Sequence, residues 1–194
     1  MLLDALLIAA AYLLGSVSTA VLVCQALGRQ DPRAVGSGNP GATNVLRSAG
    51  KAAALLTLLG DIAKGLIPVL LGKALMVSVP VIALIACAAF AGHIFPVFFG
   101  FRGGKGVATY IGVLLGISVW VGLAFACIWL LVAAVSRYSS LAALTASAAS
   151  PLVAALLGQP LPIVVASVVI TLALAVRHRA NIQRLLAGEE RRIS

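Results

Sequence analysis

Long apolar runs separated by short polar segments dominate the chain. The first run extends from about Leu2 to Leu27 and ends at Gly28 and Arg29, the second covers about Ala52 to Leu71, and the third, Ala74 to Phe101, carries no formal charge. A transmembrane helix needs about 20 apolar residues. Each of these runs therefore predicts one membrane span.

Two later uncharged runs are longer than one span. Gly106 to Ser136 can form two short helices that turn near Gly116 to Trp120, or one tilted span, and the preference of basic residues for the cytoplasmic side favours two helices. Tyr138 to Val176 is interrupted by GQPLP at Gly158 to Pro162, where two prolines and a glycine predict a turn. This second run therefore predicts two further spans.

The pattern predicts an all-α, polytopic transmembrane helical bundle of about seven spans, forming a single integral membrane domain over residues 1–194. The composition agrees, because 62% of the residues are apolar, 10% are charged and the mean hydropathy is +1.13. Seven spans place the N-terminus outside and the C-terminus in the cytoplasm, and only Lys73 falls clearly on the outer face. The basic residues predicted on the cytoplasmic face are Arg29, Arg33, Arg47, Lys51, Arg102, Lys105, Arg137, Arg177, Arg179 and Arg184.

The formal charge of +9, from 14 Lys and Arg against 5 Asp and Glu, favours an anionic partner. The basic residues form small groups between apolar runs, without a continuous basic stripe or an aromatic stacking platform, so nucleic acid is excluded as a partner. Anionic lipid and anionic substrates remain. The three cysteines lie far apart and there are two histidines, so we expect no metal and no cofactor.

The densest polar segment is GSGNPGATNVLR, Gly36 to Arg47, between the first two predicted spans. Glycines let the backbone approach an anion closely, and successive N–H groups with the start of the next helix form an anion-binding nest. GSGNPG also satisfies GxGxxG, but that dinucleotide motif requires a βαβ unit, whereas membrane helices flank this segment. A flexible turn is the alternative, but a turn does not need Asn39, Thr43 and Asn44. The segment therefore predicts phosphate binding.

A second glycine-rich segment, FRGGKGVAT from Phe101 to Thr109, is expected at the same face and also precedes a helix. It is not a Walker A loop, because Phe99 stands at the position of the first glycine and Gly106 at that of the magnesium-binding Ser or Thr. Lys105 can nevertheless act as a point charge on a phosphate oxygen. An anchoring role at the membrane surface is the alternative, and it suits Arg102 better than Lys105.

The third polar segment, Arg177 to Arg192, follows the last span, and in it His178 and Asn181 lie on one helical face. For these two residues a site and a packing role stay equally open, whereas the neighbouring arginines suit anionic headgroups. Asp61 and Lys64 lie three residues apart inside the second span, where unpaired charges are costly. We expect them to form a structural ion pair that positions the first loop, in preference to contacting substrate.

Five motifs that reach both ends of the chain together resemble one known family. They are LLGSVSTAVLV, DPRAVGSGNPGATNVLR, GKAAALLTLLGDIAKG, GHIFPVFFGFRGGKGVAT and RHRANIQRLLAGEE. The chain is similar in these motifs to the bacterial PlsY acyltransferases. The resemblance implies a seven-span protein of the bacterial cell inner membrane with its active site facing the cytoplasm. It also implies transfer of an acyl group from acyl phosphate to the sn-1 hydroxyl of glycerol 3-phosphate, which gives lysophosphatidic acid and phosphate at the first step of phospholipid synthesis.

The resemblance also assigns residues. The catalytic group it implies is Ser37, Arg47, Lys105, His178 and Asn181. It implies acyl-phosphate binding by Gly36, Ser37, Gly38, Asn39, Gly41, Ala42, Thr43 and Asn44. It implies glycerol 3-phosphate binding by Arg47, Lys105, Ser140, His178 and Asn181. Membrane lipid and a functional link to the enzyme that makes acyl phosphate complete the expected partners.

Many glycerolipid acyltransferases use a His and an Asp that are separated by four residues. The sequence lacks this pair, because the residue at that distance is Phe98 after His93 and Gln183 after His178. Acyl phosphate is already activated, so N–H donors and cations that neutralise the leaving phosphate suffice. We expect a substrate phosphate oxygen to accept the hydroxyl proton, with His178 as the alternative base. The competing classes are a small anion carrier, which would need polar groups near the membrane midplane, and a non-catalytic lipid-binding subunit.

Overall fold

The structure is a computed structural model that describes residues 1–193; Ser194, the last residue of the predicted domain, lies outside this range. Within residues 1–193 every regular element is a helix, which confirms the predicted all-α class. The elements are α1 (Leu2–Gly15), α2 (Thr19–Ala26), α3 (Ala42–Ala49), α4 (Lys51–Ala74), α5 (Val79–Ile94), η1 (Val97–Phe99), α6 (Val107–Ile117), α7 (Val119–Ser136), α8 (Ser139–Leu156), α9 (Leu161–Arg177) and α10 (Arg179–Leu186).

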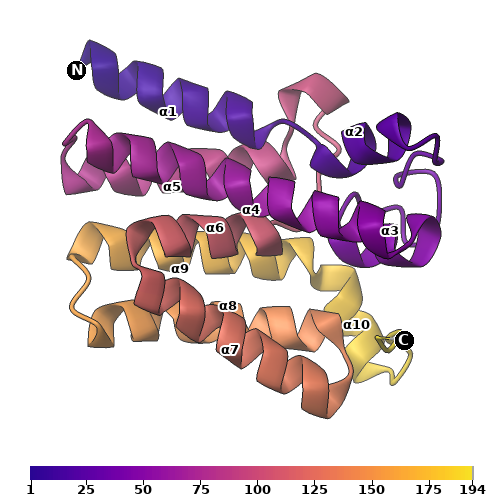
Figure 1. Ribbon diagram of the computed structural model, residues 1–194. Helices are drawn as coiled ribbons and strands as arrows, with labels where there is room; N and C mark the ends of the chain where they lie inside the picture. The colour runs from indigo at the N-terminus through magenta and orange to yellow at the C-terminus, as the bar shows by residue number, and fades with distance from the viewer. Residues whose placement is uncertain (194) are drawn as a thin grey trace.

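The long helices run along one common direction and form a bundle (Figure 1). Within residues 1–193, four helices are long and apolar enough to cross a membrane, and six crossings result if the bent pairs α1 with α2 and α9 with α10 each count as one. Helix α6 is apolar but has only 11 residues, about 16 Å against the roughly 30 Å of a bilayer core. Four to six candidate spans are thus observed where the sequence predicts about seven.

The predicted continuous first span is wrong in one respect, because α1 and α2 are bent by 45° around residues 16–18. Ser16 Oγ donates to the Tyr12 carbonyl at 2.8 Å, and the Val17 carbonyl accepts from Lys64 Nζ at 2.8 Å. Serine side chains that bond back to the preceding turn compete with the helical ladder. The break therefore supplies a buried partner for a lysine inside the bundle.

Of the two alternatives for residues 106–136, two helices are observed, with the break at Ser118. Helix α7 runs back toward the end of the bundle at which α6 begins (Figure 1). Lys73 Nζ donates to the carbonyls of Gly116 and Ile117, at 3.1 and 2.9 Å. A cation at a helix C-terminus satisfies carbonyls that the helix leaves without partners, so Lys73 caps α6 at its turn.

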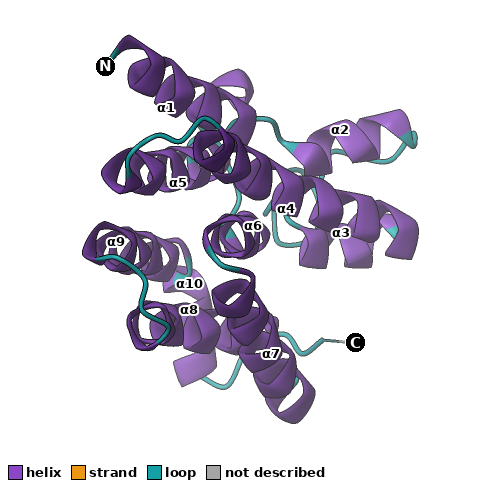
Figure 2. Ribbon diagram, turned by 60° about the vertical axis from the view of Figure 1, so that its left-hand side comes forward, coloured by secondary structure: helices purple, strands orange, loops and turns teal. Residues whose placement is uncertain are grey.

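Glycine residues lie where two helices of the bundle approach each other most closely. Gly15 of α1 lies against the Ala89 backbone of α5, and a Cβ at Gly65 of α4 would collide with the Thr109 carbonyl of α6. Such small residues let helix backbones approach in a membrane, where packing replaces the hydrophobic effect between helices. Figure 2 shows α4 and α6 as neighbours in the middle of the bundle.

The two ends of the bundle differ. The N-terminus lies at one end, whereas α3, α10 and the connection between α7 and α8 lie at the other (Figure 1). All three predicted polar segments therefore belong to the same half of the molecule. Helix α7 presents a long apolar surface outward, with Trp120, Leu131 and Val135 exposed, as expected of a helix that faces lipid.

Candidate active site

A chain of short hydrogen bonds joins three segments that are far apart in sequence. Lys105 Nζ donates to Asn181 Oδ1 at 2.6 Å, and Asn181 Nδ2 donates to Glu190 Oε1 at 2.6 Å. Ser140 Oγ, at the start of α8, donates to the same carboxylate oxygen at 2.7 Å. Three of the residues predicted for glycerol 3-phosphate, Lys105, Ser140 and Asn181, thus lie in one cluster.

Glu190 is the residue of this cluster that the sequence analysis did not assign. Its carboxylate also accepts from Arg184 Nε at 2.8 Å, and its side chain is only 8% exposed. Burial alone would raise the pKa of this carboxyl, but the donors Ser140, Asn181 and Arg184 hold the pKa below its ordinary value. The only indication in sequence is an acidic pair within an otherwise basic tail. The cluster therefore holds an anionic oxygen between several donors.

Lys105 is partly buried on a tight loop between η1 and α6. Burial lowers its pKa to about 8, and the cations of Arg184, Arg177 and Arg47 act in the same direction against the raising effect of Glu190. The loop is held to α5, because Gly104 N donates to the His93 carbonyl at 3.2 Å. Gly106 adopts φ +88° where α6 begins, a conformation that side chains disfavour. Close packing thus fixes where the ammonium lies.

His178 occupies the bend between α9 and α10 and is 2% exposed. Its Nδ1 lies 2.9 Å from the Leu174 carbonyl, which can only accept, so Nδ1 carries the proton and Nε2 is left as an acceptor. Burial is the main reason that its pKa falls to about 4, although the Leu174 contact opposes this. The imidazole is therefore neutral at physiological pH.

The first polar loop is built around Asn44, which is 3% exposed. Its Oδ1 accepts from Ser37 N at 3.0 Å, and its Nδ2 donates to the carbonyls of Pro32 and Val35 at 2.8 and 3.1 Å. Gly36 has φ +63°, and a Cβ there would collide with the Asn44 amide. Asn44 thus shapes the loop from inside while Ser37 stays exposed at its surface.

The expected nest of loop N–H groups is only partly available. The N–H groups of Ser37, Gly38 and Gly41 are bonded inside the loop, to Asn44 Oδ1 and to the carbonyls of Val35 and Asn39. In contrast, the N–H groups of Ala42 and Thr43, in the first turn of α3, have no partner within residues 1–193. The N–H groups of Gly36 and Asn39 likewise have no partner among the described residues, so the donors that remain for an anion lie at these two loop positions and at the helix start.

Arg47 lies at the far end of α3 and is exposed. Its guanidinium donates to the Arg192 carbonyl at 3.0 Å, while Ile193 N donates to the Arg137 carbonyl at 2.7 Å. The tail after α10 thus lies between α3 and the start of α8. Arg47 is brought to the edge of the Lys105 cluster without a direct contact to Lys105.

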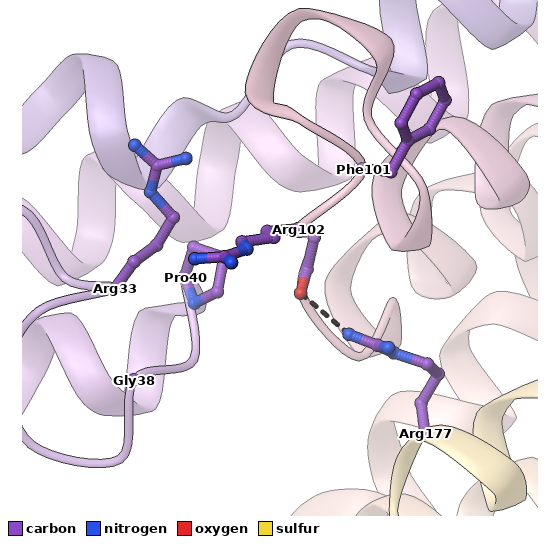
Figure 3. A pocket seen from close by; sticks show the side chains of 7 residues that line it. Arg33, Gly38, Pro40, Phe101, Arg102 and Arg177 are labelled. Atoms are coloured by element: carbon purple, nitrogen blue, oxygen red, sulfur yellow. Dashed lines mark hydrogen bonds between the residues drawn. The ribbon is translucent and has the colours of Figure 1, made fainter.

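Beside this cluster lies a cavity of about 370 Å³ between the first loop and the segment that carries Lys105 (Figure 3). Gly38 and Pro40 line it from one side, and Arg102 and Gly103 from the other. Arg33 and Arg177 complete its cationic lining. None of the three arginines was predicted as a site residue.

A second group of charges is buried inside the bundle. Asp61 and Lys64 form the ion pair that the sequence predicts, 2.8 Å apart and both less than 5% exposed. Thr19 also donates to the Asp61 carboxylate, and His93 Nδ1 lies 3.6 Å from it. Within residues 1–193, no three His, Cys, Asp or Glu side chains lie close enough to hold a metal ion.

Together these features define an integral membrane protein whose apolar helices carry a compact, cation-rich polar cluster at one end of the bundle. The chain belongs to the glycerol-3-phosphate acyltransferase family, whose pattern it matches over residues 5–188. This finding confirms the resemblance to PlsY proteins seen in the motifs.

Relatives and solved structures agree over nearly the whole chain. It is 58% identical to the glycerol-3-phosphate acyltransferase of Thioalkalivibrio sulfidiphilus, a match that covers 100% of this chain and 95% of the relative. It is 56% identical to that of Methylococcus capsulatus, with 97% and 95% covered. The crystal structure of PlsY, an integral membrane glycerol 3-phosphate acyltransferase, in its glycerol 3-phosphate form has a TM-score of 0.94 at 41% identity, covering 98% of this chain and 96% of that one. Its lysophosphatidic acid form has a TM-score of 0.92 at 40% identity, covering 97% and 94%.

Proposed function

We propose that this protein transfers an acyl group from acyl phosphate to the sn-1 hydroxyl of glycerol 3-phosphate, giving lysophosphatidic acid and phosphate. The observation that supports this most is the cluster of Lys105, Ser140 and Asn181 around a carboxylate, in a family named for glycerol 3-phosphate. A solved relative is described in forms with glycerol 3-phosphate and with lysophosphatidic acid. The reaction begins bacterial phospholipid synthesis.

Glycerol 3-phosphate binds at the Lys105 cluster in this proposal. Ser140 and Asn181 donate to the anionic Glu190 oxygen, so the same donors suit a phosphate oxygen. Lys105 supplies an ammonium that its loop holds in place and Arg47 a guanidinium at the edge, and both form charge-assisted bonds to phosphate. The Nε2 of His178, which has no donor partner within residues 1–193, accepts from a hydroxyl of the substrate in this proposal.

Acyl phosphate binds at the first loop. Its phosphate meets the free N–H groups of Ala42 and Thr43 and the positive end of the α3 dipole. Gly36, Gly38, Asn39 and Gly41 shape the approach, Asn44 holds the loop in register, and Ser37 lies at the surface near the reacting groups. The acyl chain extends into the apolar bundle or the surrounding lipid.

The chemistry needs one bond formed and one broken. The glycerol oxygen attacks the acyl carbonyl carbon, the bond from that carbon to the phosphate oxygen breaks, and the hydroxyl proton passes to the leaving phosphate. The N–H groups of Ala42 and Thr43 and the positive end of the α3 dipole stabilise the charge that develops on this phosphate, and fixing both substrates in line removes an entropic barrier. With a pKa of about 4, His178 is a weak base, which favours the phosphate oxygen as proton acceptor and leaves the imidazole to orient the hydroxyl.

We further propose seven crossings, counting the two bent pairs and the short α6 together with the four long helices. The chain then begins outside the bacterial inner membrane, and its active site faces the cytoplasm. The concentration of basic side chains around α3, α10 and the 102–105 loop supports this orientation. The mixed anhydride of acyl phosphate hydrolyses easily, so a functional link with the enzyme that makes it is expected.

The test is turnover by the purified protein in neutral detergent with acyl phosphate and glycerol 3-phosphate. We expect stoichiometric release of phosphate and lysophosphatidic acid. Absence of both products would contradict the proposal and favour a small anion carrier or a non-catalytic lipid-binding subunit instead. Equal rates with acyl-CoA would instead change the donor.

A further inference from the structure

The cavity beside the Lys105 cluster has a built cationic lining that none of the roles above uses. Its arginines come from three separate segments: Arg33 from the first loop, Arg102 from the loop before α6, and Arg177 from the end of α9 (Figure 3). Neither Lys105 nor His178 lines it. The cavity is therefore a second place where an anion can bind.

Two of the three guanidiniums are held by protein acceptors. Arg33 forms an ion pair with Asp31 at 2.7 Å and stacks near the Phe99 ring, at 5.7 Å from its centroid. Arg177 donates to the carbonyls of Gly103 and Gly104, at 2.9 and 3.1 Å. These acceptors fix the positions of both guanidiniums before any ligand binds.

Arg102 differs from its two neighbours. Its side chain is exposed, forms no hydrogen bond or ion pair within residues 1–193, and extends toward Pro40 in the cavity (Figure 3). Since Asp31 offsets the charge of Arg33, the lining keeps about two net positive charges. A phosphate monoester carries about −1.5 to −2 charges at pH 7, which matches the lining.

The cavity and the Lys105 cluster share two short stretches of chain. Gly103 and Gly104 bind Arg177 on the cavity side, while the next residue, Lys105, reaches Asn181. Likewise Arg177 lines the cavity, and the adjacent His178 is close enough to the cluster for the charges of Lys105 and Glu190 to act on its imidazole. Consecutive Cα atoms are about 3.8 Å apart, so two anions bound on the two sides would be neighbours, as in-line transfer between two phosphorylated substrates requires.

We propose that this cavity binds the phosphate group of the acyl-phosphate donor, with Arg102 as a further binding residue and with Arg33 and Arg177 as its fixed walls. The inference rests on the proposed function. It describes a phosphate site with two parts, the N–H groups of Ala42 and Thr43 and the arginine side chains of the cavity. Gly38 and Pro40 line the cavity directly before that helix start, so both halves can meet one phosphate.

An anionic lipid headgroup has the same phosphate chemistry and would also attract Arg102. The two sources make different demands, because a lipid effect requires anionic lipid in the bilayer whereas a donor effect does not. Measurements in nanodiscs of phosphatidylcholine alone, and in nanodiscs that also contain phosphatidylglycerol, separate them.

The test uses Arg102→Gln, with Arg29→Gln as the matched control, because Arg29 is an exposed arginine of the same loop region that does not line the cavity. We expect Arg102→Gln to raise KM for acyl phosphate about ten-fold or more, the loss of one charged hydrogen bond, with kcat and KM for glycerol 3-phosphate nearly unchanged. Arg29→Gln should leave all three constants unchanged. The effect should persist in nanodiscs of phosphatidylcholine alone.

A binding measurement separates this inference from the proposed function. The non-transferable acyl phosphonate analogue should bind the wild type and the Arg29→Gln variant alike, and the Arg102→Gln variant about ten-fold more weakly, without any turnover. Unchanged KM and unchanged phosphonate affinity in Arg102→Gln, with an active wild type, would overturn the inference alone. An effect seen only with phosphatidylglycerol would assign Arg102 to lipid, and a wild type without turnover would overturn the proposed function.

Discussion

Two clusters of charge in this protein have similar members and different surroundings. Asp61, Lys64 and His93 lie inside the bundle, and each is no more than 6% exposed. Lys105 and Glu190 lie at the end of the bundle, where the loops and the C-terminal tail meet. The inner cluster is closed on itself, whereas the end cluster borders a cavity and solvent.

The difference shows which property allows a charged cluster to bind a ligand. In the inner cluster Asp61 Oδ1 accepts from Thr19 and Lys64, the Val17 carbonyl accepts from Lys64, and none of these residues lines the cavity beside the end cluster. In the end cluster Ser140, Asn181 and Arg184 supply the donors, and Glu190, the anion that they hold, belongs to the short tail after α10. A ligand can replace Glu190 but not the buried Asp61. We therefore assign a structural role to the inner cluster and substrate binding to the end cluster.

The largest effect is expected for breaking the inner pair. Asp61→Ala leaves the Lys64 ammonium buried without its carboxylate, which should destabilise the fold by about 3–5 kcal/mol. Thermal unfolding in detergent measures this loss. The double variant Asp61→Leu with Lys64→Leu should recover much of it, and a double variant as unstable as the single one would contradict the assignment.

At the end cluster, Lys105→Ala should lower kcat/KM for glycerol 3-phosphate by about 100-fold with little change in melting temperature, because one charged contact to phosphate is lost. Steady-state kinetics measure the loss of kcat/KM, and a melting curve of the same variant measures its stability. Lys105→Arg, which keeps the charge, should recover part of the activity. Unaltered kinetics in Lys105→Ala would remove its proposed role.

The pH profile sharpens the same point. Since burial lowers the pKa of Lys105 to about 8, the ammonium loses its proton as pH rises through 8, and kcat/KM should fall on that alkaline side. Arginine stays protonated in proteins, so the Lys105→Arg variant should keep its activity to higher pH. Identical alkaline limbs in both proteins would show that another group titrates there.

A smaller effect is expected for His178→Gln. If a phosphate oxygen accepts the proton, loss of the imidazole removes only a positioning hydrogen bond, and turnover should fall by less than about 100-fold with an unchanged pH profile. The measurement is kcat between pH 5 and 9. A larger loss, together with a missing acidic limb, would make His178 the base.

The smallest effect concerns the tail. Glu190→Gln should lower stability by about 1 kcal/mol, because a charged acceptor of three hydrogen bonds becomes neutral. The pKa of Glu190 is held below 4.5, so its contribution is present above that pH and is lost as pH falls through the lowered pKa. Melting curves of both proteins should therefore converge in acid. A gap that persists there would exclude the carboxylate as its cause.

The sequence was sufficient for the helical class, the membrane setting and the family, because apolar runs and motif residues are local properties. It also predicted the Asp61–Lys64 pair, which the structure shows. It placed Lys105 and Asn181 among the site residues, and the structure brings these two side chains together, while their role in binding stays a prediction. It did not reveal that the Asn44 amide forms its hydrogen bonds inside the first loop, or that the helix is broken between α1 and α2 at residues 16–18. Both depend on partners, Pro32 and Lys64, that only folding defines.

By itself, then, the sequence determined which residue types occur in each polar segment and that apolar helices separate them. Only the tertiary structure decided that the tail brings Glu190 to Asn181 and Ser140, and that Arg33, Arg102 and Arg177 surround one cavity. The physical reason is that these contacts join segments up to about 140 residues apart, whose distances are set by helix packing and glycine contacts. Local pattern carries no information about such distances.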